Sequence, residues 1–186
     1  MEPRHIASVS FGKDSLAMLY LLIARGWPVD EIVFFNNGME FQAIYDTRDR
    51  VLPDLEALGI PYTEVKVIRD YCARAVIYVG LAADESQRFE RCGYPNRSLP
   101  LAEWGMTEAD CLTYCRQLGF QWLEETENGP VPLYEILDRV SCWCCGNKNL
   151  KELKHIYLYL PQYWERLKDL QVHMSRPMKG WYQDGR

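Results

Sequence analysis

The feature that most constrains the fold is an alternation of short apolar runs with segments of helical periodicity. Four runs rich in β-branched and aromatic residues, bounded by polar residues or glycine, predict buried strands: RHIASVS, DEIVFFNN, PYTEVKV and AVIYVGL. Between the first two runs, over Leu16–Ile23, apolar side chains recur at the spacing of one helix face. A second helical stripe covers Phe41–Leu58 and ends at Gly59.

This order predicts the fold class, an α/β protein with a parallel twisted sheet and helices on both faces. A ligand is then expected at the carboxyl ends of the strands. One joint does not fit a simple alternation, because only Ile68–Ala75 connects the third and fourth runs. A crossover between neighbouring parallel strands needs about a dozen residues or more. Either the fourth run is not a parallel neighbour of the third, or a segment near Tyr71–Ala75 is missing from the chain.

Most of the elements predicted in the second half of the chain are helices. At Met106–Cys111 the sequence predicts a helix start, with Thr107 as the N-cap and acidic residues in the first turn, and this helix ends at Gly119. Two more helices are predicted at Leu150–Leu160 and Pro161–Val172. We expect a nucleotide-binding α/β part over residues 1–135 and a cysteine-bearing helical extension of the same domain over 136–186.

Length and composition narrow the classes of protein. The 186 residues, 48% of them hydrophobic, fit one domain with a sizeable core. The net charge of −5 argues against a broad nucleic-acid-binding surface. No apolar run approaches the roughly 20 residues of a membrane helix, and the start of the sequence lacks the order of a signal peptide. We therefore expect a cytoplasmic protein with no membrane partner.

The turn after the first predicted strand is the first candidate site. Its sequence is SFGKDS, residues 10–15, and a predicted helix follows. It is not the common ATP-binding loop, because Asp14 follows Lys13 where that motif has a serine or threonine. Two hydroxyls, a glycine amide, a helix N-terminus and the charge of Lys13 would still surround an anion-sized space. The alternative is a plain strand-to-helix turn in which Ser15 caps the helix.

The second candidate site is SCWCCGNK, residues 141–148. Cys142 and Cys145 have the spacing that lets two thiolates of one turn reach a single metal ion, and Cys144 is a third candidate. Further ligands would have to come from Cys72, Cys92 or His155. Zinc and an iron–sulfur cluster both accept thiolate ligands, so the spacing of the cysteines does not distinguish between them. A redox dithiol and simple burial are the alternatives.

The remaining cysteines do not suggest a disulfide framework. The chain has seven cysteines, an odd number, together with a sizeable core and no export signal. Cys111 and Cys115 are four residues apart on a predicted helix and share a face, so we expect burial rather than metal binding.

Several stretches resemble a known family. SFGKDS resembles the SGGxDS loop of the adenine nucleotide α-hydrolase-like (PP-loop ATP pyrophosphatase) superfamily, with Phe11 in place of a small residue. Within it, NNGMEF and GLAADESQR are similar to the DTGxE and GxRxDESxxR elements of the phosphoadenylylsulfate (PAPS) reductase family. YPNRSLPLAEWGMTEAD and PLYEILDRVSCWCCGNK resemble its helix entry and its PLY…R…GCxxC ending. The resemblance covers roughly residues 6–170.

The resemblance implies that ATP or (phospho)adenylylsulfate lies across the strand ends. It assigns catalysis to Lys13, Asp14 and Ser15. It also implies that Cys72 is a remnant of the family's cysteine-containing helix. The nucleotide-binding residues that it implies are Ser10, Phe11, Gly12, Lys13, Asp14, Ser15, Asn37, Gly38, Glu40, Gly80, Asp84, Glu85, Ser86 and Arg88. The candidate metal ligands are Cys142, Cys145, Cys144 and Cys72. For Asp84–Ser86 the alternative is an ordinary polar loop.

Two departures from the family pattern decide between reactions. Ala82 stands where the family usually has an arginine, and the ending MKGWYQDGR has no cysteine to attack sulfur. We therefore expect an ATP-dependent adenylylation coupled to sulfur transfer, with Mg²⁺ neutralising the pyrophosphate. A nucleic acid or a sulfur carrier would be the acceptor partner, and we allow for a homodimer. The alternatives are a sulfonucleotide reductase using a thiol of Cys142–Cys145 or of a partner, and a non-catalytic nucleotide-binding subunit.

Overall fold

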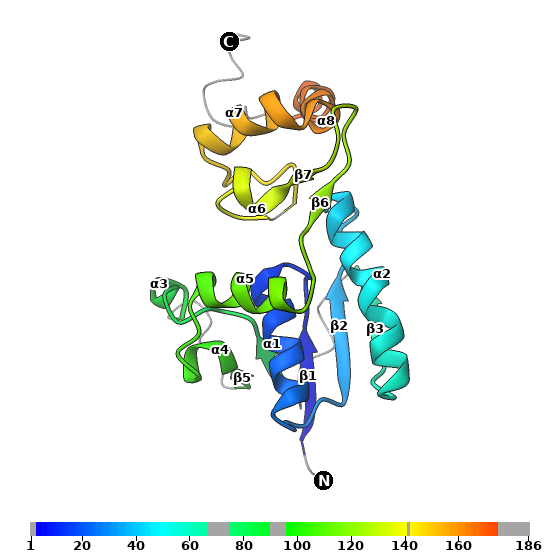
Figure 1. Ribbon diagram of the computed structural model, residues 1–186, viewed down its shortest axis with the longest axis vertical. Helices are drawn as coiled ribbons and strands as arrows, with labels where there is room; N and C mark the ends of the chain where they lie inside the picture. The colour runs from blue at the N-terminus through cyan, green and yellow to red at the C-terminus, as the bar shows by residue number, and fades with distance from the viewer. Residues whose placement is uncertain (1–2, 67–74, 90–95, 141, 175–186) are drawn as a thin grey trace. The chain divides into compact units, whose positions relative to one another are not determined.

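The computed structural model describes residues 3–66, 75–89, 96–140 and 142–174. The chain divides into two compact units. Unit 1 consists of Met1–Gly38 and Ile44–Gln121, and unit 2 consists of Met39–Ala43 and Trp122–Arg186. In Figure 1 the strands of the larger sheet are drawn in blue to green, and the C-terminal helices of unit 2 in yellow to orange.

Unit 1 is built on a five-stranded sheet in the order β3-β2-β1-β4-β5, in which every neighbouring pair is parallel. Its strands are β1 (Arg4–Ser8), β2 (Glu31–Phe35), β3 (Tyr62–Val65), β4 (Ala75–Val79) and β5 (Arg97–Ser98). Helices flank this sheet (Figure 1). The predicted fold class, an α/β protein with a parallel sheet, is confirmed.

The strand order explains the short joint between the third and fourth predicted strands. β4 pairs with β1, in the register Ile6↔Ile77. β3 pairs with β2, so that β2 and β1 separate β3 from β4. The third and fourth strands are therefore not neighbours, as one of the two readings of this joint expected. Residues 67–74 themselves lie outside the described residues.

The helices described in unit 1 are α1 (Lys13–Ala24), α2 (Gln42–Ala57, which starts in unit 2), α3 (Ser86–Phe89), α4 (Pro100–Glu103) and α5 (Glu108–Gln117). Two of them, α1 and α2, coincide with the two predicted apolar stripes. On α1, the side chains of Leu16, Leu19 and Leu22 are fully buried. Because α1 packs against α5 and α4, part of its surface is covered by other helices.

Both ends of α5 have specific caps. The Thr107 hydroxyl accepts a hydrogen bond from the Asp110 amide at 3.2 Å, and the Asp110 carboxylate accepts one from the Thr107 amide at 3.0 Å. This capping box confirms the predicted helix start. After the helix, Gly119 has a φ of +83°, and Arg50 donates hydrogen bonds to the carbonyls of Leu118 and Gly119.

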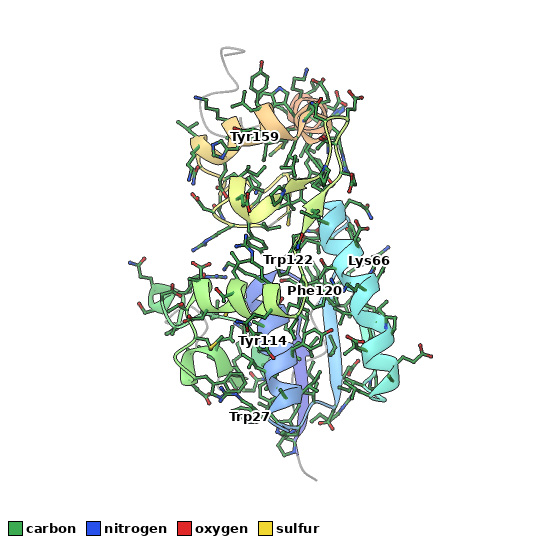
Figure 2. The ribbon with its side chains drawn as sticks, viewed as in Figure 1. Trp27, Lys66, Tyr114, Phe120, Trp122 and Tyr159 are labelled. Atoms are coloured by element: carbon green, nitrogen blue, oxygen red, sulfur yellow. The ribbon has the colours of Figure 1, made fainter. Side chains whose placement is uncertain are left out.

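The end of unit 1 is packed by aromatic residues. Phe120, labelled in Figure 2, follows α5, and its ring centroid lies 5.7 Å from that of Tyr20 on α1. The Arg50 guanidinium lies 4.2 Å from the centre of the Phe120 ring. These contacts hold the C-terminal end of α5 on the rest of unit 1.

The described residues of unit 2 include a short antiparallel pair of strands followed by helices. Its elements are β6 (Leu123–Glu124), β7 (Val131–Pro132), α6 (Leu133–Ile136), α7 (Leu150–Tyr159) and α8 (Pro161–Val172). The two predicted C-terminal helices are confirmed. The Trp122 ring, labelled in Figure 2, packs edge-on against Tyr134, with centroids 4.9 Å apart.

A buried carboxylate ties the segment Met39–Ala43 into unit 2. Glu124 is buried, and its carboxylate accepts hydrogen bonds from the Tyr163 hydroxyl at 2.8 Å and the Ala43 amide at 3.0 Å. Phe41 packs edge-on against Tyr163.

The domain boundary expected near residue 135 stays a prediction. In the described part of the chain, no helix combines the length and the apolar character that crossing a membrane requires.

Candidate functional site

The turn between β1 and α1 brings two serine hydroxyls together. The oxygens of Ser10 and Ser15 lie 3.1 Å apart, and the Ser10 amide donates to the Ser15 hydroxyl at 3.1 Å. Gly12 is the N-cap of α1, and Ser15 lies inside the first turn with its hydroxyl 3.1 Å from the Gly12 carbonyl. Ser15 is therefore not the N-cap, and the alternative reading of this residue as a cap is wrong.

Phe11 shapes the same turn through its backbone. Its φ is +58°, in the left-handed region that glycine adopts most easily. Its side chain is fully buried, with the ring centroid 5.3 Å from that of Phe34 in an edge-on arrangement. Only the backbone of Phe11 can face a ligand, so its expected part in nucleotide binding would be limited to the peptide groups.

Gly80 lets the end of β4 approach this turn. A Cβ atom at residue 80 would lie 2.7 Å from the Cα and 2.8 Å from the backbone nitrogen of Ser15. Any other residue would push β4 and the first turn of α1 apart. The position of Ser15 therefore depends on this glycine.

A buried lysine lies among carboxylates beside the turn. The Lys13 ammonium is 2.9 Å from both carboxylate oxygens of Asp14 and 2.8 Å from an oxygen of Glu108. Burial would lower the pKa of Lys13, but the two carboxylates outweigh it and raise the pKa. Burial raises the pKa of Asp14, against the opposing charge of Lys13. The lysine is therefore held as a cation.

Three carboxylates form a cluster at this position. Asp14, Glu85 and Glu108, which we name the carboxylate cluster, each offer one oxygen, and these oxygens lie within 4.8 Å of one another. Such oxygen ligands are those that Mg²⁺ prefers. Glu108 was not assigned by the sequence analysis. Its only local signal is an acidic residue in the first turn of a helix.

The segment after β4 connects to this cluster. Glu85 is buried, and its carboxylate accepts hydrogen bonds from the Ala82 amide at 3.3 Å and from Arg88. Asp84 accepts a hydrogen bond from the Glu108 amide at 3.0 Å. Ser86 begins α3. Of the residues expected to line the second wall, Glu85 is therefore brought to Asp14, while Arg88 pairs with Glu85.

The turn after β2 is organised by a residue that the sequence analysis did not assign. The Asn36 side-chain oxygen accepts hydrogen bonds from the Gly38 amide at 2.8 Å and the Tyr45 hydroxyl at 2.9 Å. Gly38 has a φ of +76°. Asn37 and Gly38 belong to unit 1, whereas Glu40 belongs to unit 2.

The cysteine loop, residues 142–148, lies in unit 2 together with Glu40. Cys142, Cys144 and Cys145 are partly exposed. The Cys142 thiol donates to the Glu40 carboxylate at 3.4 Å. Burial raises the pKa of Glu40, while the Cys142 bond and the charge of Lys148 act against it. The structure therefore brings one expected nucleotide or metal residue, Glu40, to the cysteines.

Cys72, Cys92 and His155 are the other metal ligands that the sequence suggested. Cys72 and Cys92 lie outside the described residues. The Nδ1 atom of His155 lies 2.6 Å from the Ile136 carbonyl oxygen. In the described part of the chain, the carboxylate cluster is the one group of three potential ligand side chains with atoms within 4.8 Å. A metal ion at the cysteine loop would have to draw the thiols closer together.

Comparison with known proteins identifies a family and a similar solved structure. The model of the phosphoadenosine phosphosulfate reductase domain matches residues 4–103, which include the β1–α1 turn, Gly80 and Glu85. Among solved structures, the chain is similar to the U34-tRNA thiolase NcsA from Methanococcus maripaludis with its 4Fe-4S cluster. The identity is 16%, the match covers 95% of this chain and 75% of that chain, and the TM-score is 0.46. No curated protein matches.

Proposed function

This chain belongs to the phosphoadenosine phosphosulfate reductase domain family, and we propose that it binds an adenine nucleotide at the β1–α1 turn. We propose further that it uses ATP to adenylylate an acceptor, which then receives sulfur. The observation that carries the proposal is the pair of facing hydroxyls at the start of α1, beside a buried lysine and three carboxylates. Hydroxyl, amide and ammonium donors are the groups that bind phosphate.

In the proposed complex, Ser10, Ser15 and the amides of the turn hold the phosphate chain. The carboxylate cluster would hold Mg²⁺, and the ion would supply positive charge to stabilise the pyrophosphate leaving group. Lys13 now neutralises this cluster, so Mg²⁺ binding would release its ammonium to the phosphates. Donors that are already in place stabilise the developing charge without reorganisation.

The proposed reaction has two displacements. An oxygen of the acceptor attacks the α-phosphorus of ATP, the bond from that phosphorus to the bridging oxygen breaks, and pyrophosphate leaves. A hydrosulfide then attacks the activated carbon, the carbon–oxygen bond breaks, and AMP leaves with the oxygen. The acceptor would be a carbonyl of a nucleic-acid base or a carboxylate of a sulfur-carrier protein. The hydrosulfide would come from a separate sulfur donor.

The cysteine loop is proposed as the metal-binding part of the same enzyme. Its three thiols are ligands for zinc or for an iron–sulfur cluster. Cys72 and the Glu40 carboxylate are further candidate ligands. Elemental analysis and an absorbance spectrum of anaerobically purified protein distinguish the two: broad visible absorbance indicates iron–sulfur, and a colourless protein with stoichiometric zinc indicates a zinc site. Protein without either metal would contradict this part.

Nucleotide binding is tested by calorimetry with ATP and Mg²⁺. We expect Ser15→Ala to weaken ATP binding about tenfold, because it removes one hydroxyl that would contact a charged phosphate. Thr113→Ala is the matched control, since Thr113 is exposed on α5 and its hydroxyl donates to the Ala109 carbonyl at 2.9 Å. Equal ATP affinities for the wild type and both variants would refute the proposed site.

The family also supports the reductase alternative, because its name describes that reaction and three thiols lie in the cysteine loop. Incubation with sulfur-labelled phosphoadenylylsulfate and reduced thioredoxin tests it. Sustained sulfite release that is lost in Cys142→Ser or Cys145→Ser would replace adenylylation as the assigned reaction. ATP binding without pyrophosphate release, with nucleic-acid and sulfur-carrier acceptors alike, would indicate the non-catalytic alternative.

A further inference from the structure

One carboxylate beside the β1–α1 turn comes from a part of the chain that the family match does not cover. Glu108 is the first residue of α5, whereas the matched region ends at residue 103. Its carboxylate lies 2.8 Å from the Lys13 ammonium, across 95 residues of sequence. The family match therefore gives Glu108 no role, and the proposed reaction uses it only as one of three acids.

Backbone contacts fix the position of Glu108. The Asp84 carboxylate accepts a hydrogen bond from the Glu108 amide at 3.0 Å, and the Ala83 amide donates to the Met106 carbonyl at 2.7 Å. Asp84 and Ala83 both belong to the segment after β4. The helix that Glu108 begins, α5, also packs against α1 (Figure 1). Glu108 is thus held both by the segment after β4 and by the packing of its own helix.

The Lys13 ammonium donates all its hydrogen bonds to acids. Lys13 is buried, and its Nζ atom lies 2.9 Å from both oxygens of Asp14 and 2.8 Å from one oxygen of Glu108. These contacts are as many as an ammonium has N–H groups. A phosphate oxygen can therefore bind Lys13 only by replacing a carboxylate oxygen. Of the two side chains, Glu108 is the more exposed, at 33% against 22% for Asp14, so Glu108 can turn more easily into water.

We propose that Glu108 is a specificity-determining residue of the nucleotide site, which holds the Lys13 ammonium in the free protein and makes the site select metal-bound nucleotide. The inference rests on the proposed binding of ATP at the β1–α1 turn. A metal-free nucleotide would gain Lys13 only by leaving the Glu108 carboxylate unpaired beside phosphates of like charge. With a metal-bound nucleotide, Glu108 would exchange the ammonium for the metal ion, so neither charge is left unpaired.

Calorimetry of ATP binding to the full chain, once with Mg²⁺ and once with EDTA, tests this inference. Glu108→Gln removes the charge at constant side-chain length. In EDTA, we expect this variant to bind ATP about tenfold more tightly than the wild type, because one repelling charge is gone and Lys13 is held by fewer carboxylates. With Mg²⁺, it should bind ATP no more tightly than the wild type, because a charged metal ligand is lost. General damage to the site would instead weaken binding under both conditions.

Glu56→Gln is the matched control, because it makes the same change at an exposed acid of α2 in the same unit. It should leave both ATP affinities within about twofold of the wild type, as expected for a surface charge. Glu108→Asp is a second variant, which keeps the charge but shortens the side chain that reaches Lys13. Its affinity for ATP in EDTA should lie between those of the wild type and Glu108→Gln.

The outcomes distinguish this inference from the proposed function. If Ser15→Ala binds ATP as tightly as the wild type under both conditions, the nucleotide site is not at the β1–α1 turn, and both proposals fail. If Ser15→Ala weakens binding but Glu108→Gln gains no affinity in EDTA, only the inference about Glu108 fails. Equal affinities of the wild type in Mg²⁺ and in EDTA would also overturn it. If Glu108→Gln does not fold, Glu108→Asp is judged by the same gain in EDTA.

Discussion

Phe11 combines a positive φ with a fully buried aromatic ring. The backbone conformation suits glycine, and the ring contributes apolar packing against Phe34. The sequence motif marks this position as one where a small residue is usual, but it does not show where the ring goes. The side chain is buried because β2 and the turn are packed together in unit 1, which is a property of tertiary structure.

The two effects at Phe11 can be separated by substitution. Phe11→Ala should lower the free energy of unfolding by about 3–5 kcal/mol, the usual loss for a buried phenylalanine. Phe11→Gly should be about 1 kcal/mol less destabilising than Phe11→Ala, because glycine adopts the left-handed conformation without strain. Urea unfolding of both variants measures the difference.

Phe34 is the control residue for the expected ranking of the glycine and alanine variants at residue 11. It is buried on β2 in an extended strand, where glycine is less favourable than alanine. Phe34→Gly should therefore be more destabilising than Phe34→Ala. If Phe11→Gly is also less stable than Phe11→Ala, the positive φ of Phe11 does not store strain.

At the level of elements, local capping signals identify helix starts. α5 and α7 both begin with a capping box, formed by Thr107 with Asp110 and by Asn149 with Glu152. Each box is closed within four residues, so its hydrogen bonds depend on neighbours in sequence. The start of α5 at Thr107 could therefore be predicted, whereas the partners of α1 in packing could not.

The cap of α5 gives a prediction on stability and pH. Thr107→Ala should cost about 1 kcal/mol at neutral pH, while Thr107→Ser should cost little. Hydrogen bonds from the Thr107 hydroxyl and amide hold the pKa of Asp110 below its usual value. Because the pKa of Asp110 is lower in the folded than in the unfolded protein, its ionised form stabilises the fold. This stabilisation is fully present above the unfolded-state pKa, which is near 3.9. It is lost as the pH falls through the lower pKa of the folded state.

The difference in unfolding free energy between wild type and Thr107→Ala should therefore shrink below about pH 4. Urea unfolding at neutral pH and at several acidic pH values measures it. A difference that stays constant down to the pH at which the protein unfolds would show that Asp110 does not contribute through its charge.

On the scale of the whole molecule, the described cysteines fall into two sets. Cys111 and Cys115 are fully buried on α5 in unit 1, as the sequence spacing predicts, whereas the thiols of the cysteine loop are partly exposed in unit 2. Burial raises the pKa of Cys115 to about 12, and the Cys115 thiol donates to the Lys13 carbonyl at 3.3 Å. The two sets should differ in reactivity.

In native metal-free protein at pH 8, iodoacetamide should modify Cys142 and Cys145 at least about a hundredfold faster than Cys115. The reason is that the thiolate is the reacting form, and its fraction falls as the pKa rises. Peptide mass spectrometry over time measures the rates, and protein unfolded in urea should show similar rates at all three residues. Rapid native modification of Cys115 would contradict its burial.

The sequence by itself determined the features that depend on near neighbours: the helical stripes, the caps, the alternation of strands and helices, and the turn that carries Ser10 and Ser15 at the start of α1. Tertiary structure alone decided the strand order, the Lys13–Glu108 pair across 95 residues, the Cys142–Glu40 contact across 102 residues and the burial of Lys148. Periodicity and capping act within a few residues, so they leave a local trace in the sequence. Contacts between distant segments depend on which surfaces pack together, and no local pattern records that choice.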